Sequence, residues 1–228
     1  MSLSFTWLGH SAFLFEIDGH KMLLDPFLTG NPLAPRSADE IACDIIFLTH
    51  AHGDHIGDAV PIAKRTGAKI VSNHEIASWA DRQGAPSTHG QNTGGGCDHG
   101  FVHAKQTIAF HSSSFPDGSY GGDPNGFIFT TSGGRRIYFA GDTALFSDMQ
   151  LIGDANIDIA FLPIGDNYTM GPDDAIQATK FIHPKLVVPM HYNTFPLIAV
   201  DVAGWARRVN NETGAQPVVL DPGGSFTF

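Results

Sequence analysis

Short apolar runs, partly alternating with polar residues, open the chain and predict β-strands. Strands are expected at residues 2–8, 12–17 and 21–24, and Asp18-Gly19 makes a hairpin turn between the second and third. The run at 45–48 is β-branched and aromatic without a helical period, which is typical of a buried strand. Between them, the proline-containing stretch 27–39 predicts a loop over the surface or over a functional site.

After residue 57 the pattern changes, and predicted helices alternate with strands. Asp58 is a candidate N-cap for a helix that ends at Gly67, and a second helix is expected over 75–83. The polar, glycine-rich stretch 84–100 predicts a loop or an irregular hairpin, and 112–126 predicts another long loop. The remaining expected elements are strands at 69–72, 101–105, 106–110, 127–131, 135–139, 157–162, 186–190 and 217–220, and helices at about 144–152, 173–182 and 198–210.

This order of elements predicts the fold class. Hairpin strands come first and then alternate with helices, and the chain does this roughly twice. Two mixed sheets packed face to face with helices outside, an α/β (α+β) arrangement, satisfy that order. No repeat and no low-complexity linker interrupts the chain, so one domain over 1–228 is expected.

Composition limits the partners and the compartment. The net charge of −10 disfavours nucleic acid as a partner, because an acidic surface repels phosphate backbones. No segment approaches the roughly 20 apolar residues of a membrane span, and no signal peptide is recognised at the start. Two isolated cysteines fit a reducing compartment, so a cytoplasmic protein acting on a small molecule is expected. The sequence leaves open whether the chain forms a homo-oligomer.

The strongest chemical signal is a cluster of four ligand-type residues within six positions, directly after the strand at 45–48. His50 and His52 are two residues apart, so at the end of an extended strand both side chains project to the same side. Gly53 permits a sharp turn, which can direct Asp54 and His55 toward a second point in space. This stretch predicts a loop that holds two cations close together.

Three further ligand-type residues follow apolar strands elsewhere in the chain. They are His111, Asp142 and His191, and each comes at or just after the end of a predicted strand. If these strand ends meet at one edge of the two sheets, the loops assemble a single site on a rigid scaffold. Imidazole and carboxylate ligands without a thiolate favour Zn, Mn, Fe or Ni.

These residues give the chain a resemblance to the metallo-β-lactamase superfamily, whose signature His-x-His-x-Asp-His matches 50–55. The later His, Asp and His of that family match His111, Asp142 and His191, and its earlier Asp matches Asp25. The stretches 7–11, 163–166, 169–172 and 189–196 resemble uncharacterised metal-dependent hydrolases related to the sugar-phosphate lactonase (ascorbate-6-phosphate lactonase-like) branch.

The resemblance implies an αββα sandwich with a two-metal site along one edge. One ion, most simply Zn, would be held by His50, His52 and His111, and the other by Asp54, His55 and His191, with Asp142 bridging. Two such ions activate a bound water near neutral pH. The expected reaction is hydrolysis of a small ester, lactone, thioester or phosphoester by that hydroxide, with Asp54 orienting the nucleophile or relaying its proton.

Four further residues near these ligands in sequence or by resemblance each have two alternative roles. Asp25 is expected to orient a ligand histidine rather than to bind metal, although Asp-Pro is also a common start of a turn. His10 could face the site or hydrogen-bond within its own turn. Tyr192 and Asn193 adjoin a ligand and could contact substrate or could fix the loop. The other histidines have no informative spacing and are interpreted as structural or solvent-facing: His20, His74, His89, His99, His103 and His183.

Other functional classes are possible on the same scaffold. A di-iron redox protein is one alternative, although that branch normally needs a flavin domain, for which 228 residues leave no room. A metal-binding protein with little catalysis is the other. Nuclease activity is disfavoured by the acidic balance, and β-lactam hydrolysis by Asp142, since those enzymes often use Cys at this position.

Overall fold

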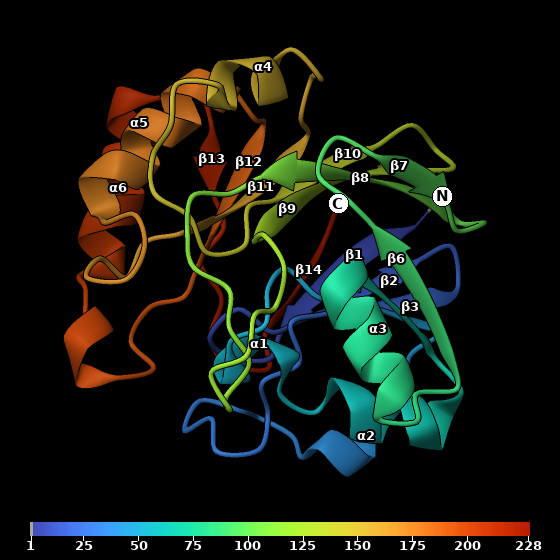
Figure 1. Cartoon of the computed structure of the whole chain (residues 1–228). Coiled ribbons are helices and arrows are strands. Elements are labelled where there is room, and N and C mark those ends of the chain that lie inside the picture. Colours follow the sequence, from blue (N-terminus) through green and yellow to red (C-terminus); the bar gives the residue numbers. More distant parts are fainter. Residues whose placement is uncertain (1) are drawn as a thin grey trace.

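The computed structural model describes residues 2–228 and contains two seven-stranded mixed sheets packed face to face (Figure 1). The first sheet has the order β14-β1-β2-β3-β4-β5-β6. Its neighbours pair antiparallel from β14 to β3 and parallel from β3 to β6. These strands are β1 (Leu3–Trp7), β2 (Phe13–Ile17), β3 (His20–Leu24), β4 (Ile45–Phe47), β5 (Lys69–Asn73), β6 (Ser87–Gln91) and β14 (Ser225–Thr227).

The second sheet repeats this plan with the order β13-β12-β11-β10-β9-β8-β7. Its pairs are antiparallel from β7 to β10 and parallel from β10 to β13. The strands are β7 (Gly96–Asp98), β8 (Val102–Ile108), β9 (Asn125–Thr131), β10 (Arg136–Phe139), β11 (Ile159–Pro163), β12 (Leu186–Met190) and β13 (Gln216–Pro217).

Helices cover the outer face of each sheet and make the outer layers of a four-layer αββα sandwich (Figure 1). The predicted fold class is thereby confirmed. α2 (Ala59–Thr66) and α3 (His74–Arg82) pack on the first sheet, and α4 (Met149–Gly153), α5 (Pro172–Ile182) and α6 (Val202–Glu212) pack on the second. The short segments are α1 (Gly53–Ile56) and the 3₁₀ turns η1 (Ala38–Glu40) and η2 (Pro196–Ile198). No helix among residues 2–228 is long and apolar enough to cross a membrane.

Aromatic side chains fill the space between the two sheets. Alternate residues of β1 are buried, so Phe5 faces inward and its ring lies 5.0 Å from that of Phe161 on β11. Phe161 also contacts Phe13 and Phe15 of β2, at ring distances of 4.9 and 5.2 Å. Edge-to-face aromatic contacts of this kind fix the two sheets relative to each other, and they hold the strand ends that carry the polar site.

Several predicted elements differ from the structure, and local hydrogen bonds explain why. The two strands expected over 101–110 are one strand, β8 (Val102–Ile108), because Gln106 lies at an inward position and its backbone bonds to Gly94 and Gly95. The stretch 84–100 is not a loop throughout: it contains β6 and β7, edge strands whose polar composition hides them. Asp58 precedes α2 but does not cap it, because its carboxylate accepts bonds from Leu28 and Thr29 instead.

Two of the later helices, α4 and α6, begin after their predicted starts. The segment after residue 143 is not helical until Met149, since the N–H of Ala144 donates to Phe110 O. The last helix begins at Val202 rather than at residue 198, because Asn193 binds the backbone of Ile198 and Val200. The closing strand at 217–220 is reduced to β13, and β14, which pairs with β1, was not predicted.

Candidate metal centre

The predicted ligand residues, which follow four different strands, meet at one edge of the sandwich. His191 directly follows β12, and His50 and Asp142 follow β4 and β10 by three residues each. His111 follows β8 by three residues. The side chains of His50, Asp142 and His191 are almost completely buried, whereas His111 is partly exposed. Parallel neighbouring strands end at the same edge of a sheet, which explains how residues far apart in sequence come together here.

The first group of side chains consists of His50, His52 and His111. One ring nitrogen of each lies within 4.8 Å of the others. Nε2 of His50 is 3.0 Å from Nδ1 of His52, so both rings point toward one place. Burial lowers the pKa of all three imidazoles, and that of His50 most strongly. Neutral imidazoles keep a lone pair available for a cation.

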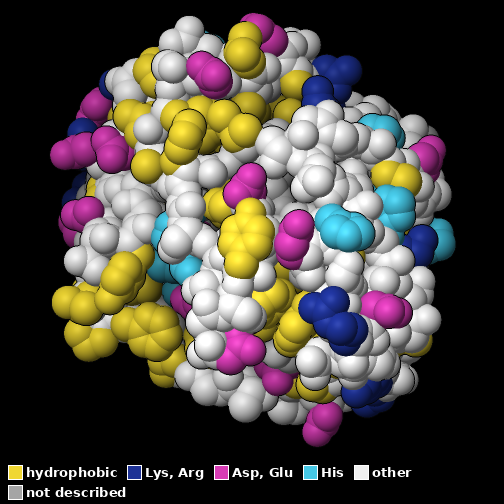
Figure 2. Space-filling view, viewed as in Figure 1, with side chains coloured by type: hydrophobic (Ala, Val, Ile, Leu, Met, Phe, Trp, Pro, Cys, Tyr) yellow, Lys and Arg dark blue, Asp and Glu magenta, His cyan; other side chains and the backbone are white. Residues whose placement is uncertain are grey.

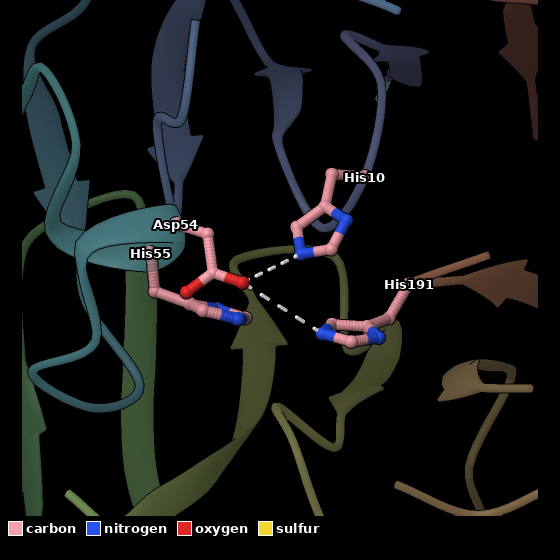
Figure 3. A group of neighbouring side chains, drawn as sticks. All are labelled: His10, Asp54, His55 and His191. Carbon is pink, nitrogen blue, oxygen red and sulfur yellow. Dashed lines mark hydrogen bonds and ion pairs between the residues drawn. The ribbon is translucent and has the colours of Figure 1, made fainter. Parts of the chain in front are cut away.

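The second group contains Asp54, His55 and His191 together with His10 (Figure 3). Oδ2 of Asp54 lies 3.1 Å from Nε2 of His10 and 4.0 Å from Nε2 of His191. The structure therefore places the fully buried ring of His10 at the site rather than within its own turn. Its other nitrogen, Nδ1, is hydrogen-bonded to Oγ1 of Thr194 at 2.8 Å.

Asp142 lies between the two groups. Its Oδ2 atom is 3.0 Å from Nε2 of His191 and 3.3 Å from Nε2 of His55, and it is 3.6 Å from His111 and 4.0 Å from His50. Burial opposes ionisation of Asp142, but the charges of His191 and His55 outweigh it and hold its pKa well below the ordinary value. One carboxylate thus faces ring nitrogens of both groups.

Asp25 makes hydrogen bonds that fix the orientation of one predicted ligand, His55. Its carboxylate accepts hydrogen bonds from the backbone N–H of Thr49 at 2.9 Å and from the Thr49 hydroxyl at 2.7 Å. It also bonds Nδ1 of His55 at 2.8 Å, which directs Nε2 of that ring toward Asp142. Asp25 is fully buried and orients a histidine, the arrangement expected from the sequence.

Unsatisfied buried atoms test whether cations fit this site. Within residues 2–228, Nε2 of His55, Oδ1 of Asp142 and Nδ1 of His191 are buried without a hydrogen-bond partner. Leaving such atoms unpaired is costly, at about 1–3 kcal/mol each or more for charged groups. All three belong to residues of the predicted ligand set, and imidazole nitrogens with carboxylate oxygens are the donors that Zn, Mn, Fe and Ni accept. The residues therefore fit divalent metal ions.

Tyr192 and Asn193 make contacts that fix the loop. The ring of Tyr192 is buried and stacks on Trp7 at 5.2 Å, and the side-chain oxygen of Asn193 accepts a hydrogen bond from Val200 N. Their alternative role as substrate contacts has no support in these interactions. Sequence reasoning did not single out four other residues beside the site, although each is close in sequence to a predicted site residue: Thr49, Thr194, Phe27 and Phe195.

The sequence model of the β-lactamase superfamily domain matches residues 4–191 of this chain. The chain belongs to the metallo-β-lactamase superfamily. A UPF0173 metal-dependent hydrolase of Thermus thermophilus is 50% identical over 217 residues, which cover 95% of each chain. A UPF0173 metal-dependent hydrolase of Heliobacterium modesticaldum is 46% identical over 234 residues, covering 99% of this chain and 98% of the relative.

A solved structure agrees with this membership. Igni18, a metallo hydrolase from the hyperthermophilic archaeon Ignicoccus hospitalis, superposes with a TM-score of 0.92 at 40% identity and covers 100% of this chain and 99% of its own. The superfamily member described here is accordingly a metal-dependent hydrolase, and the superfamily and enzyme class predicted from its sequence are confirmed. Its assignment to a lactonase-related branch stays a prediction.

Proposed function

We propose that this metallo-β-lactamase superfamily member hydrolyses a small ester, lactone, thioester or phosphoester at a pair of divalent cations, most simply Zn²⁺. His50, His52 and His111 would hold one ion, and Asp54, His55 and His191 would hold the other. The observation that carries the proposal is the position of Asp142, whose Oδ2 atom lies 3.0–4.0 Å from histidine nitrogens of both groups. A carboxylate in that position can serve two cations at once.

When bound, such a pair of ions supplies Lewis acidity and lowers the pKa of water to near neutrality. The chain's own contribution is to position the groups around the reaction. Asp54 is the candidate catalytic residue, because its carboxylate is partly exposed at the opening of the site and is fixed by His10 at 3.1 Å. It would orient the attacking water and accept its proton, and the buried His10 would hold Asp54 in place.

The surroundings of the site favour a substrate with an apolar part. The rings of Phe27 and Phe195 both lie 5.7 Å from that of His10, and Phe195 is exposed. At another part of the site, His111 and Phe110 help to line a cavity of about 520 Å³, a volume suited to a small molecule. The ionisable groups that lower the pKa of Asp54 and Asp142 most strongly are the histidines His10, His55 and His191 rather than lysines or arginines. A carbonyl substrate with an apolar group therefore fits better than a multiply charged phosphate.

The test combines metal analysis with a substrate panel. The protein is purified without added metal, its Zn, Mn, Fe and Ni contents are measured, and esters, lactones, thioesters and phosphodiesters are assayed. About two ions per chain and turnover that disappears on chelation and returns with metal are expected. Full metal occupancy with no turnover across the panel would contradict the proposal. Stoichiometric iron with oxygen or nitric oxide consumption would indicate the di-iron redox alternative instead.

A further inference from the structure

A second group of metal-ligating side chains lies outside the catalytic centre. It consists of His89, Cys97 and His99, each of which places one ligand atom within 4.8 Å of the other two. All three side chains are half-buried, so they are neither locked in the core nor spread over the open surface. The sequence offered no sign of this group, because its histidines lie in a polar stretch and Cys97 is isolated.

The fold gives this group a particular position, at the edges of both sheets. His89 lies on β6, the last strand of the first sheet, and Cys97 lies on β7, the last strand of the second. His99 directly follows β7. Figure 1 shows β6 and β7 on the same side of the molecule, and Figure 2 shows histidine side chains at the surface of that side.

Neighbouring contacts hold the imidazoles in place. The rings of His89 and His99 lie 5.3 Å apart at 83°, and the edge of the His99 ring meets Phe47 at 5.4 Å. The backbone N–H of His99 donates to Val102 O at 2.9 Å. Gln91 on β6 donates to Ala104 O on β8 at 3.1 Å, so a hydrogen bond already crosses between the sheets beside the group. The ligand atoms are thus partly ordered before any ion binds.

We propose that His89, Cys97 and His99 bind a Zn²⁺ ion that joins the edges of the two sheets. One thiolate and two imidazoles are ligands that Zn²⁺ prefers, and a fourth position remains for solvent. On binding, the Cys97 thiol releases its proton to solvent and its sulfur donates to the metal.

This site differs chemically from the catalytic centre and does not depend on the proposed function. The predicted catalytic ligands include no sulfur, whereas this group contains Cys97. An ion here would tie β6 to β7 and so oppose separation of the sheet edges. Because the ligands come together only in the folded chain, bound Zn²⁺ stabilises that state.

Cobalt(II) tests the proposal, since a thiolate bound to Co²⁺ gives a charge-transfer band in the near ultraviolet that imidazole and carboxylate ligands do not give. The metal-free protein is titrated with Co²⁺ as the wild type and as Cys97→Ser, with Cys43→Ser as the matched control. Cys43 is the other thiol and is buried in the core behind the first sheet. The band should reach the intensity of one thiolate-bound Co²⁺ per chain in the wild type and in Cys43→Ser, beyond any Co²⁺ that the catalytic centre takes up without giving this band, and should be lost in Cys97→Ser. Its absence from the wild type, or its persistence in Cys97→Ser, would overturn the proposal.

Alkylation provides a second readout that needs no substitution of the cysteine. Zn²⁺ should protect Cys97 from a thiol reagent, and His99→Ala should weaken that protection by lowering Zn²⁺ affinity at least about 10-fold. Burial raises the pKa of Cys43 to about 12, so Cys43 stays unreactive and does not obscure the result. Circular dichroism of His99→Ala shows whether the variant is folded. A Cys97 alkylation rate that Zn²⁺ does not change would contradict the site.

Discussion

Asp142 and His191 follow β10 and β12, two strands separated by β11, and yet their Oδ2 and Nε2 atoms lie 3.0 Å apart. Close backbone packing makes this contact possible. A side chain on Gly165 would place its Cβ 2.1 Å from His191 O, and Gly141 adopts φ +64° with Thr49 against it. The two glycines let the loops after β10, β11 and β12 approach closely enough for one carboxylate to reach several imidazoles.

The first prediction concerns Asp142 itself. Asp142→Asn keeps the size of the side chain but removes the charge that two cations would share. The variant should lose at least one metal equivalent, and its turnover should fall by more than the roughly 10–100-fold typical of residues that only orient a ligand. Elemental analysis and steady-state kinetics on any active substrate measure both effects. Asp154→Asn, an exposed residue after α4, is the matched control. Two-metal content with full activity in Asp142→Asn would exclude a bridging role.

Asp25 should affect metal affinity without touching metal. In Asp25→Asn, the amide can accept the bond from Thr49 N but can no longer offer two carboxylate oxygens to Thr49 and His55. Metal affinity should fall roughly 10–100-fold because His55 is no longer oriented. Stability should fall by about 1–3 kcal/mol because buried donors lose an acceptor. Competition with a chelator and urea unfolding measure the two effects. If affinity is unchanged while stability falls, Asp25 is structural only.

His10 separates positioning from metal binding. His10→Ala removes the contacts to Asp54 and Thr194. It does not remove any proposed metal ligand. Metal content should stay intact, while kcat should fall because Asp54 is no longer held. His10→Gln, which can still bond Asp54, should recover part of the loss, and Thr194→Val should show a smaller defect. Unchanged kcat in His10→Ala would return His10 to a packing role.

The sequence predicted those parts of the site that depend on local pattern. The residues His50 to His55 follow a strand with no helical period, and their clustering alone pointed to metal. Asp142 and His191 were predicted from the apolar strands that precede them together with the family resemblance, and parallel strands end together. Site residues in the loops that follow strands are therefore predictable where apolar runs define the strands clearly.

Other parts depend on contacts that no local pattern carries. β6 is a polar edge strand, so no apolar pattern predicted its pairing with β5. The position of His89 could therefore not be predicted either. The rings of Phe27 and Phe195 approach His10 through two loops whose conformations are set by tertiary contacts. Asp58 has the sequence of a helix cap, but Thr29 competes for its carboxylate.

The last prediction concerns pH and lies at the opposite ends of the strands from the metal centre. Asp158 precedes β11, and its carboxylate accepts hydrogen bonds from Arg136 N at 2.9 Å and from Lys185 Nζ at 2.7 Å. Burial opposes its ionisation, but the bond from Lys185 and that from Arg136 outweigh burial and lower the pKa of Asp158 below its ordinary value.

The sign of the effect follows from that lowered pKa. A carboxyl with a lower pKa in the folded state contributes stability above the unfolded-state pKa of about 3.9 and loses it as the pH falls through the folded value. Asp158→Asn should therefore destabilise the protein at pH 7. We expect a cost of about 1 kcal/mol, because Lys185 is largely exposed and water screens the pair. As the pH falls through the folded-state pKa of Asp158, the wild type and the variant should converge, since the carboxyl is then increasingly protonated in both states.

Urea unfolding of metal-free wild type and Asp158→Asn at pH 7 and at low pH measures this difference directly. Both proteins are compared without metal. The effect of histidine titration at the metal centre on stability is then the same in both and cancels in the comparison. Lys185→Met should reproduce most of the loss at pH 7, because it removes the ammonium that bonds Oδ1. If the difference in stability between wild type and Asp158→Asn stays constant across this pH range, the loss comes from altered hydrogen-bond geometry of the amide. The charge of Asp158 would then not stabilise the fold.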